Sequence, residues 1–123
     1  MSGMMFPKTP SKKKRKKHKT SILHRKDGTC YLCIRLHNDF RYHKDLHEHH
    51  VFGGPNRDIS EAEGFKVYLD LEHHETGKEA VHLNAESMKL IQQDCQRKYE
   101  QTHTRQQFME LIGRNYLEED YEQ

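Results

Sequence analysis

The sequence predicts a small α+β domain in which two short strands precede two helices and bound metal supplements the hydrophobic core. Short apolar segments at 46–52 and 66–71 have strand character, and apolar residues recur at helical spacing after position 84. Hydrophobic residues make up only 33% of the 123 positions, which leaves a domain of this size little to bury. Pairs of cysteine and histidine recur through the same region, and structural zinc adds roughly 10–16 kcal/mol to the folding of small domains at neutral pH.

Charge is distributed unequally along the chain. Ten of the 21 Lys and Arg residues lie in residues 1–26, which contain no Asp or Glu, so residues 27–123 carry the other 11 together with all 19 acidic residues. We therefore expect a disordered basic tail at 1–26, a folded domain at 27–117 and an acidic tail at 118–123. The folded part is net acidic, so generic attraction to nucleic acid rests mainly on the basic tail.

The basic run in this tail is a candidate phosphate-binding arm, because dense positive charge binds nucleic acid through the release of counterions. The run consists of Lys12, Lys13, Lys14, Arg15, Lys16 and Lys17. The alternatives are a solubilising charge run and a nuclear localisation signal, and both patterns have low specificity.

Two of the three cysteines, Cys30 and Cys33, form a C-x-x-C motif within residues 28–36. We expect a zinc knuckle there, with two thiolates on a tight turn that leads into a short strand. No signal peptide and no apolar stretch of about 18 residues is present, so we expect no disulfides, no membrane association and a cytoplasmic location. Cys95 falls in a helical pattern and is expected to be a small buried hydrophobe.

The middle of the chain predicts two strands and a connection between them. The strand at 46–52 ends at a Gly-Gly-Pro sequence, which forces a turn. Residues 58–64 predict a loop or a single helical turn, because Ser60-x-x-Glu63 matches a capping box. Apolar residues at 67, 69 and 71 alternate with less apolar ones, which predicts a second strand with one buried face.

Two helices are predicted in the last third of the chain. The first has one apolar stripe at helical spacing, formed by Met88, Ile91, Cys95 and Tyr99. The second begins at the capping-box pattern Thr104-x-x-Gln107 and ends before Gly113, which stands where a terminating glycine belongs. We assign both helices to packing over the sheet and not to catalysis.

The histidine pairs indicate chemistry on a phosphodiester. Its hydrolysis needs a base that activates water, a cation that stabilises negative charge, and a group that orients the base. His49 and His50 end the first predicted strand, Asn56 lies in the following turn, and His74 follows the second strand. Adjacent residues of a flat strand point to opposite faces, so joint action of His49 and His50 requires a bend at the glycines.

These motifs resemble the HNH endonucleases of the ββα-metal class, and most closely a small phage-type HNH protein. The resemblance spans about residues 28–117, and its most specific parts are HHVFGGPNR at 49–57 and GRNYL at 113–117. It implies a metal-dependent DNA endonuclease with a hairpin–helix core, a zinc knuckle and additional C-terminal helices. It also implies that His50 is the general base and that His49 and His74 hold a catalytic Mg²⁺ or Mn²⁺ ion. His82 either replaces or supplements His74, or is a half-buried histidine without that role.

The chain departs from the family pattern in two places. Family members commonly have a second C-x-x-C just before the last histidine, where this chain has Asp70 and His73. Both residue types can bind zinc, so we expect a structural zinc held by Cys30, Cys33, Asp70 and His73; the alternative is a weakened or lost site.

The second departure concerns the middle asparagine of the family, whose position falls near Phe65. A phenylalanine cannot orient an imidazole, and Asn56 is the substitute candidate. Arg57, next to it, either contacts a DNA phosphate or is a solvated residue of the turn.

A rival interpretation is a non-catalytic zinc-binding module that binds DNA or a packaging protein, and a weaker one is metal storage. The net acidic domain, the missing asparagine and the altered cysteine pair favour the first rival. The family resemblance implies a phage-encoded protein in the cytoplasm of a bacterial host, with DNA and phage terminase subunits as partners.

Overall fold

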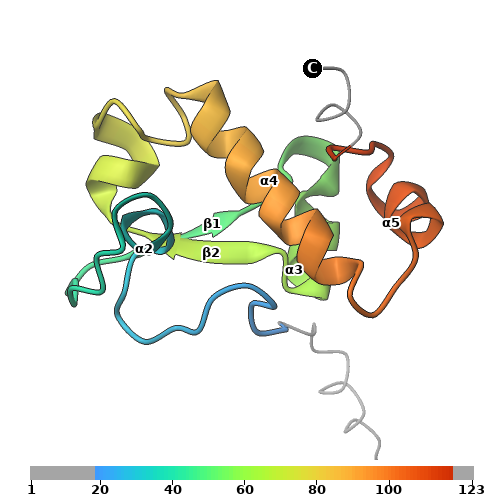
Figure 1. Cartoon of the computed structure of the whole chain (residues 1–123), viewed down its shortest axis with the longest axis horizontal. Helices are drawn as coiled ribbons and strands as arrows, with labels where there is room; N and C mark the ends of the chain where they lie inside the picture. Colours follow the sequence, from blue (N-terminus) through green and yellow to red (C-terminus); the bar gives the residue numbers. More distant parts are fainter. Residues whose placement is uncertain (1–18, 118–123) are drawn as a thin grey trace, which may run out of the picture.

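A computed structural model describes residues 19–117, so the basic run at 12–17 and the acidic tail at 118–123 lie outside the described part of the chain. The described part has an α+β architecture, as predicted: a two-stranded antiparallel sheet with helices packed around it (Figure 1). Helix α4 (Ala85–Tyr99) crosses over the strands, while α3 (Arg57–Glu63) and α5 (Arg105–Ile112) lie at one end. The opposite end holds α2 (Tyr31–His37) and the helical turn η3 (Glu72–Thr76).

The sheet pairs β1 (His47–His50) with β2 (Lys66–Leu69), so both predicted strands are present in shorter form. His49 is opposite Val67 in the register. The prediction of one buried face on the second strand is wrong, because all four residues of β2 are buried. Lys66, only 4% exposed, is tolerated because its ammonium pairs with the carboxylates of Glu48 and Glu61.

The connection between the strands is more helical than the sequence indicated. It contains a short 3₁₀ turn, η2 (Gly54–Asn56), followed directly by α3. Ser60 is inside α3 and does not form the predicted cap; its buried hydroxyl donates to the carbonyl of Phe52 at 2.7 Å and accepts from the Phe52 N–H at 3.1 Å. These two bonds fix the turn that follows β1 against α3.

Residues 20–24 also belong to the folded unit, which corrects the expected end of the basic tail at position 26. The Ile22 N–H donates to the carbonyl of Gly64 at 3.0 Å, and the Tyr68 N–H donates to Nδ1 of His24 at 3.2 Å. Ile22 and Leu23 also pack on the core. The segment therefore covers one edge of β2, and apolar side chains inside a basic stretch explain why charge alone misplaced the boundary.

The C-x-x-C segment is a helix start and not the predicted turn and strand. Cys30 is the N-cap of α2, and Cys33 lies in its first turn. The segment is helical because this places Leu32 and Cys33 together on the core, where both are buried. The two thiols still lie close enough to share one ion, since the first helical turn brings positions three apart onto one side.

Both C-terminal helices are confirmed. In α4 the stripe residues Ile91, Cys95 and Tyr99 are buried, and the Asn84 side chain caps the first turn. In α5 both hydrogen bonds of the Thr104–Gln107 capping box are present. Gly113 ends the helix at φ 93°, a conformation that favours glycine.

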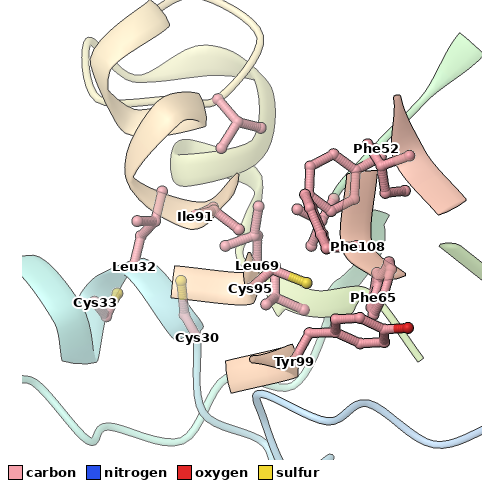
Figure 2. Packing of buried hydrophobic residues seen from close by; sticks show 14 residues of the cluster. Cys30, Leu32, Cys33, Phe52, Phe65, Leu69, Ile91, Cys95, Tyr99 and Phe108 are labelled. Carbon is pink, nitrogen blue, oxygen red and sulfur yellow. The ribbon is translucent and has the colours of Figure 1, made fainter. Parts of the chain in front are cut away.

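The core is one cluster of buried residues in which two regions can be distinguished (Figure 2). One is an aromatic group in which the Phe52 ring lies 5.7 Å from the Phe65 ring and 5.6 Å from the Phe108 ring. The other surrounds the cysteines, where Leu32 of α2, Ile91 of α4 and Leu69 of β2 are fully buried. This second part forms the floor beneath the C-x-x-C motif. Within residues 19–117, no helix has the length and apolar character that a membrane span requires.

Candidate metal centres

The first candidate centre brings together Cys30, Cys33, Asp70 and His73, the four residues expected to hold zinc. Nδ1 of His73 lies 3.6 Å from Sγ of Cys30 and 3.5 Å from Sγ of Cys33. Asp70 contributes both of its oxygens, one 3.4 Å from Sγ of Cys33 and the other 3.1 Å from Nδ1 of His73. Helix α2 therefore supplies the thiols, and the segment after β2 supplies the other two side chains.

Three of these four separations have the length of the edges of a tetrahedral zinc site, and the 3.1 Å between Asp70 and His73 is shorter. Zn–S bonds of about 2.3 Å and Zn–N or Zn–O bonds of about 2.0–2.1 Å put neighbouring ligand atoms about 3.3–3.6 Å apart. The four residues thus form a cluster that could hold a metal ion and is consistent with zinc.

The electrostatics of this cluster also suit a cation. Burial raises the pKa of Cys30, and burial together with the Cys30 thiol raises that of Cys33, so both thiols are protonated until an ion displaces the protons. Burial acts to raise the pKa of Asp70, but the His73 N–H and the Cys33 thiol outweigh it, and that pKa lies below its ordinary value. Asp70 is therefore a carboxylate at neutral pH.

Three residues around this cluster were missed by the sequence analysis. Nε2 of His43 lies 3.7 Å from Sγ of Cys33 and 3.8 Å from the Asp70 carboxylate, close to the ligand set. Glu79 accepts from Nε2 of His73 at 3.1 Å and also pairs with His37 at 2.8 Å. A carboxylate on the far nitrogen fixes the tautomer of a metal-binding histidine and leaves Nδ1 free. Their spacing in the sequence gave no signal, because only the fold brings them together.

The second candidate centre consists of His49, His74 and His82, each with a ring nitrogen within 4.8 Å of the others. His49 comes from β1, His74 from η3 and His82 from the loop before α4. Nε2 of His74 lies 3.1 Å from Nε2 of His82, and the His49 ring lies 5.5 Å from the His74 ring. All three were candidate ligands from the sequence, and His82 joins His74 instead of replacing it.

His49 is the most informative member of this group. It is 6% exposed, and its Nε2 is the one buried side-chain nitrogen or oxygen in residues 19–117 without a hydrogen-bond partner. Burial, followed by the nearby His74 and His82, lowers the pKa of His49 to about 3, so the ring is neutral and carries a free lone pair. A buried polar atom without a partner costs roughly 1–3 kcal/mol, and a bound cation would remove that cost.

His50 faces a different partner. Its Nε2 lies 2.7 Å from Oε1 of Glu61 on α3, and Glu61 is in turn held by Lys66 at 3.2 Å. The Glu61 carboxylate accepts a hydrogen bond from the Nε2–H of His50, which leaves Nδ1 of His50 as the nitrogen with a lone pair. Glu61 was not identified from the sequence, because it lies 11 residues from His50 and matches no family position.

Asn56 does not take the orienting role that the sequence suggested. Its side-chain amide donates to the carbonyl of Ile112 at 3.0 Å, which ties the turn after β1 to the end of α5. Glu61 occupies the position beside His50 instead. The physical reason is that Asn56 lies in η2, where its amide meets the unpaired carbonyls at the end of α5.

One cavity of about 330 Å³ is lined both by the second candidate centre and by His50. Its lining includes His49, His50, His74 and His82, and the two charged residues Glu48 and Arg57. His49 and His50 both line this cavity together with Gly53 and Gly54, and the chain bends at Val51 and Phe52, directly after β1. Arg57, at the start of α3, is exposed and adds a positive charge to the wall.

No family model matches the chain, and comparisons with curated proteins and with solved structures found no match either.

Proposed function

We propose that this protein is a metal-dependent DNA endonuclease of the HNH, ββα-metal type. The observation that supports it most strongly is the partnerless Nε2 of buried His49, which faces His74 and His82 across a cavity that also contains His50 and Arg57. A base, a cation site and a positive side chain in one cavity are the groups that phosphodiester hydrolysis requires. The antiparallel strand pair followed by a helical turn that bears His74 is consistent with a ββα-metal core.

In this mechanism His50 is the general base. Its Nδ1 takes a proton from the attacking water, while Glu61 accepts the hydrogen bond from Nε2 and stabilises the imidazolium that forms. Glu61 thereby performs the orienting role that the family gives to an asparagine. Lys66 holds the Glu61 carboxylate in place through its own ion pair at 3.2 Å.

His49, His74 and His82 would hold the catalytic ion. A divalent ion there supplies positive charge that stabilises the scissile phosphate and the leaving oxygen. Three imidazole nitrogens suit a transition ion better than Mg²⁺, which prefers oxygen ligands. Of the two ions expected from the sequence, the ligand set therefore favours Mn²⁺, and it also accommodates Zn²⁺, Ni²⁺ and Co²⁺. Arg57 contacts a phosphate oxygen of the bound DNA.

The cluster of Cys30, Cys33, Asp70 and His73 would hold a structural Zn²⁺ ion. Zinc there would join α2 to the segment after β2, at the end of the sheet that presents His74. This site alone would also serve a non-catalytic zinc module that binds DNA or a packaging protein such as a terminase subunit. The two functions differ in what His50 does, since the zinc module does not need it.

Cleavage of supercoiled plasmid tests the proposal. We expect purified protein to nick the plasmid with Mn²⁺ and not with EDTA, and His50→Ala to lower the rate roughly 10²–10⁴-fold. Glu61→Gln is expected to cause a smaller loss, since the amide still accepts a hydrogen bond but cannot balance the imidazolium charge. Each variant is first checked for an unchanged circular dichroism spectrum. Equal inactivity of wild type and His50→Ala with every ion would reject the endonuclease and favour the zinc module.

A further inference from the structure

His47, on β1, lies against the candidate ligand His74. His47 and His49 are two positions apart on β1, so their side chains leave the strand on the same face. Nδ1 of His47 lies 2.8 Å from Nδ1 of His74, and the two rings meet edge to face with centroids 5.0 Å apart. His74 therefore has an imidazole neighbour at each of its nitrogens, with His82 at Nε2.

The distance between two imidazole nitrogens distinguishes a hydrogen-bonded pair from two ligands of one metal ion. Two nitrogens bound tetrahedrally to one ion at about 2.0–2.1 Å are about 3.3 Å apart, whereas a hydrogen-bonded pair has a separation near 2.9 Å. The 2.8 Å between His47 and His74 fits a hydrogen bond. The 3.1 Å between His74 and His82 lies midway between these two values, and His74, His82 and the partnerless His49 each have a ring nitrogen within 4.8 Å of the others.

Only one proton arrangement lets His74 bind an ion through Nε2. That nitrogen must present its lone pair, so the ring proton of neutral His74 has to be on Nδ1. The proton then needs an acceptor, and Nδ1 of His47 is the group at hydrogen-bond distance. The carboxylate of Glu75 also lies near this nitrogen, but at 3.6 Å it is too far away for a hydrogen bond.

We propose that His47 is a positioning residue whose Nδ1 accepts a hydrogen bond from the Nδ1–H of His74 and so keeps the lone pair of His74 Nε2 available to the metal ion. The proposal rests on the proposed function only in requiring that His49, His74 and His82 bind a divalent ion. His47 orients His74 in the same way that Glu79 orients His73 in the cysteine centre, by accepting a hydrogen bond from the ring nitrogen that does not bind the metal. Groups in this outer position typically change metal affinity by 10–100-fold when they are removed.

Two measurements on the full-length chain test the proposal. The first is the tautomer of His74 in metal-free protein, read from long-range ¹H–¹⁵N correlations of the imidazole. The second is Co²⁺ affinity at the second centre, measured by visible absorption after the cysteine centre has been filled with one equivalent of Zn²⁺. The variants are His47→Phe, which keeps a ring without an acceptor, and His47→Asn, whose side-chain oxygen can replace Nδ1. Glu75→Gln is the matched control, because the Glu75 carboxylate also lies near Nδ1 of His74 but too far away to form a hydrogen bond.

We expect wild-type His74 to carry its proton on Nδ1, and His47→Phe to lose that preference and bind Co²⁺ 10–100-fold more weakly. His47→Asn should restore most of the affinity, and Glu75→Gln should leave it unchanged. An Nε2 proton on wild-type His74, or unchanged Co²⁺ affinity in His47→Phe, would overturn the proposal. Neither readout involves DNA cleavage, so failure of the endonuclease proposal would leave these results interpretable, and the wild-type tautomer does not depend on the folding of any variant.

Discussion

His73 and His74 are joined by a single peptide bond, yet their imidazoles belong to two different clusters of metal-binding side chains. The π-helical turn η3 produces this arrangement, and Asp70 anchors it. The side-chain carboxylate of Asp70 accepts a hydrogen bond from the backbone N–H of His73 at 2.7 Å. The backbone carbonyl of Asp70 accepts one from the backbone N–H of His74 at 2.9 Å. An ion bound at the cysteine centre would therefore hold the same short segment that places His74 in the second centre.

The first prediction concerns coupling between the two centres. Cys30→Ser should weaken zinc binding at the first centre, and it should also weaken Co²⁺ binding at the second, although Cys30 does not contact it. Zinc at 100 times its dissociation constant stabilises a fold by about 2.7 kcal/mol, or roughly 10–20 °C in Tm for a domain of this size. That stabilisation should be largely lost in the variant when thermal unfolding is followed with and without Zn²⁺.

Cys95→Ser is the matched control, because Cys95 is a buried cysteine outside both clusters. It should retain the zinc-dependent increase in Tm even if its overall stability is lower. Unaltered Co²⁺ affinity in Cys30→Ser would show that the two centres are independent.

The second prediction concerns pH. Burial raises the pKa of both Cys30 and Cys33, so the metal-free thiols are protonated at neutral pH and zinc must displace two protons. Zinc affinity should therefore increase with pH, by about 100-fold per unit between pH 7 and 8. Calorimetry in buffers with different ionisation enthalpies would count the protons directly. Release of fewer than one proton would mean that the thiols are not both ligands.

The third prediction distinguishes two candidates for the fourth zinc ligand. Asp70 lies 3.4 Å from Sγ of Cys33 and 3.1 Å from Nδ1 of His73, whereas His43 lies 3.7 Å from the same sulfur and at the margin of the cluster. Asp70→Ala should therefore reduce zinc affinity more than His43→Ala does. Competition with a chromophoric chelator gives both affinities, and the opposite order would assign the position to His43.

The helices and strands were predictable where a local pattern determined them. The Thr104–Gln107 capping box, the terminal Gly113 and the stripe of Ile91, Cys95 and Tyr99 are all local, and all are confirmed. Elements determined by distant contacts were predicted less well. The helix at Tyr31–His37 forms because it buries Leu32 and Cys33 under α4 and β2, and nothing in its own seven residues shows that environment.

The same distinction explains what was predictable in the candidate site. The sequence identified the side chains able to bind metal, because cysteine and histidine pairs are visible without a fold, and the four proposed zinc ligands do lie together. It did not identify the groups that orient them. Glu61, Glu79 and His47 act across pairs of segments, and an acidic residue or a single histidine in a strand has no distinguishing pattern.

The most direct test of the account is DNA cleavage by His49→Ala compared with wild type, after both proteins have been loaded with Zn²⁺ at the cysteine centre. The buried Nε2 of His49 has no partner within the described residues, so its removal leaves no hydrogen bond unmade there, and the fold should remain intact. We predict that the variant retains its zinc and its Tm but loses Mn²⁺-dependent nicking of supercoiled plasmid. Nicking at the wild-type rate in folded His49→Ala would contradict the proposal that this histidine cluster holds the catalytic ion.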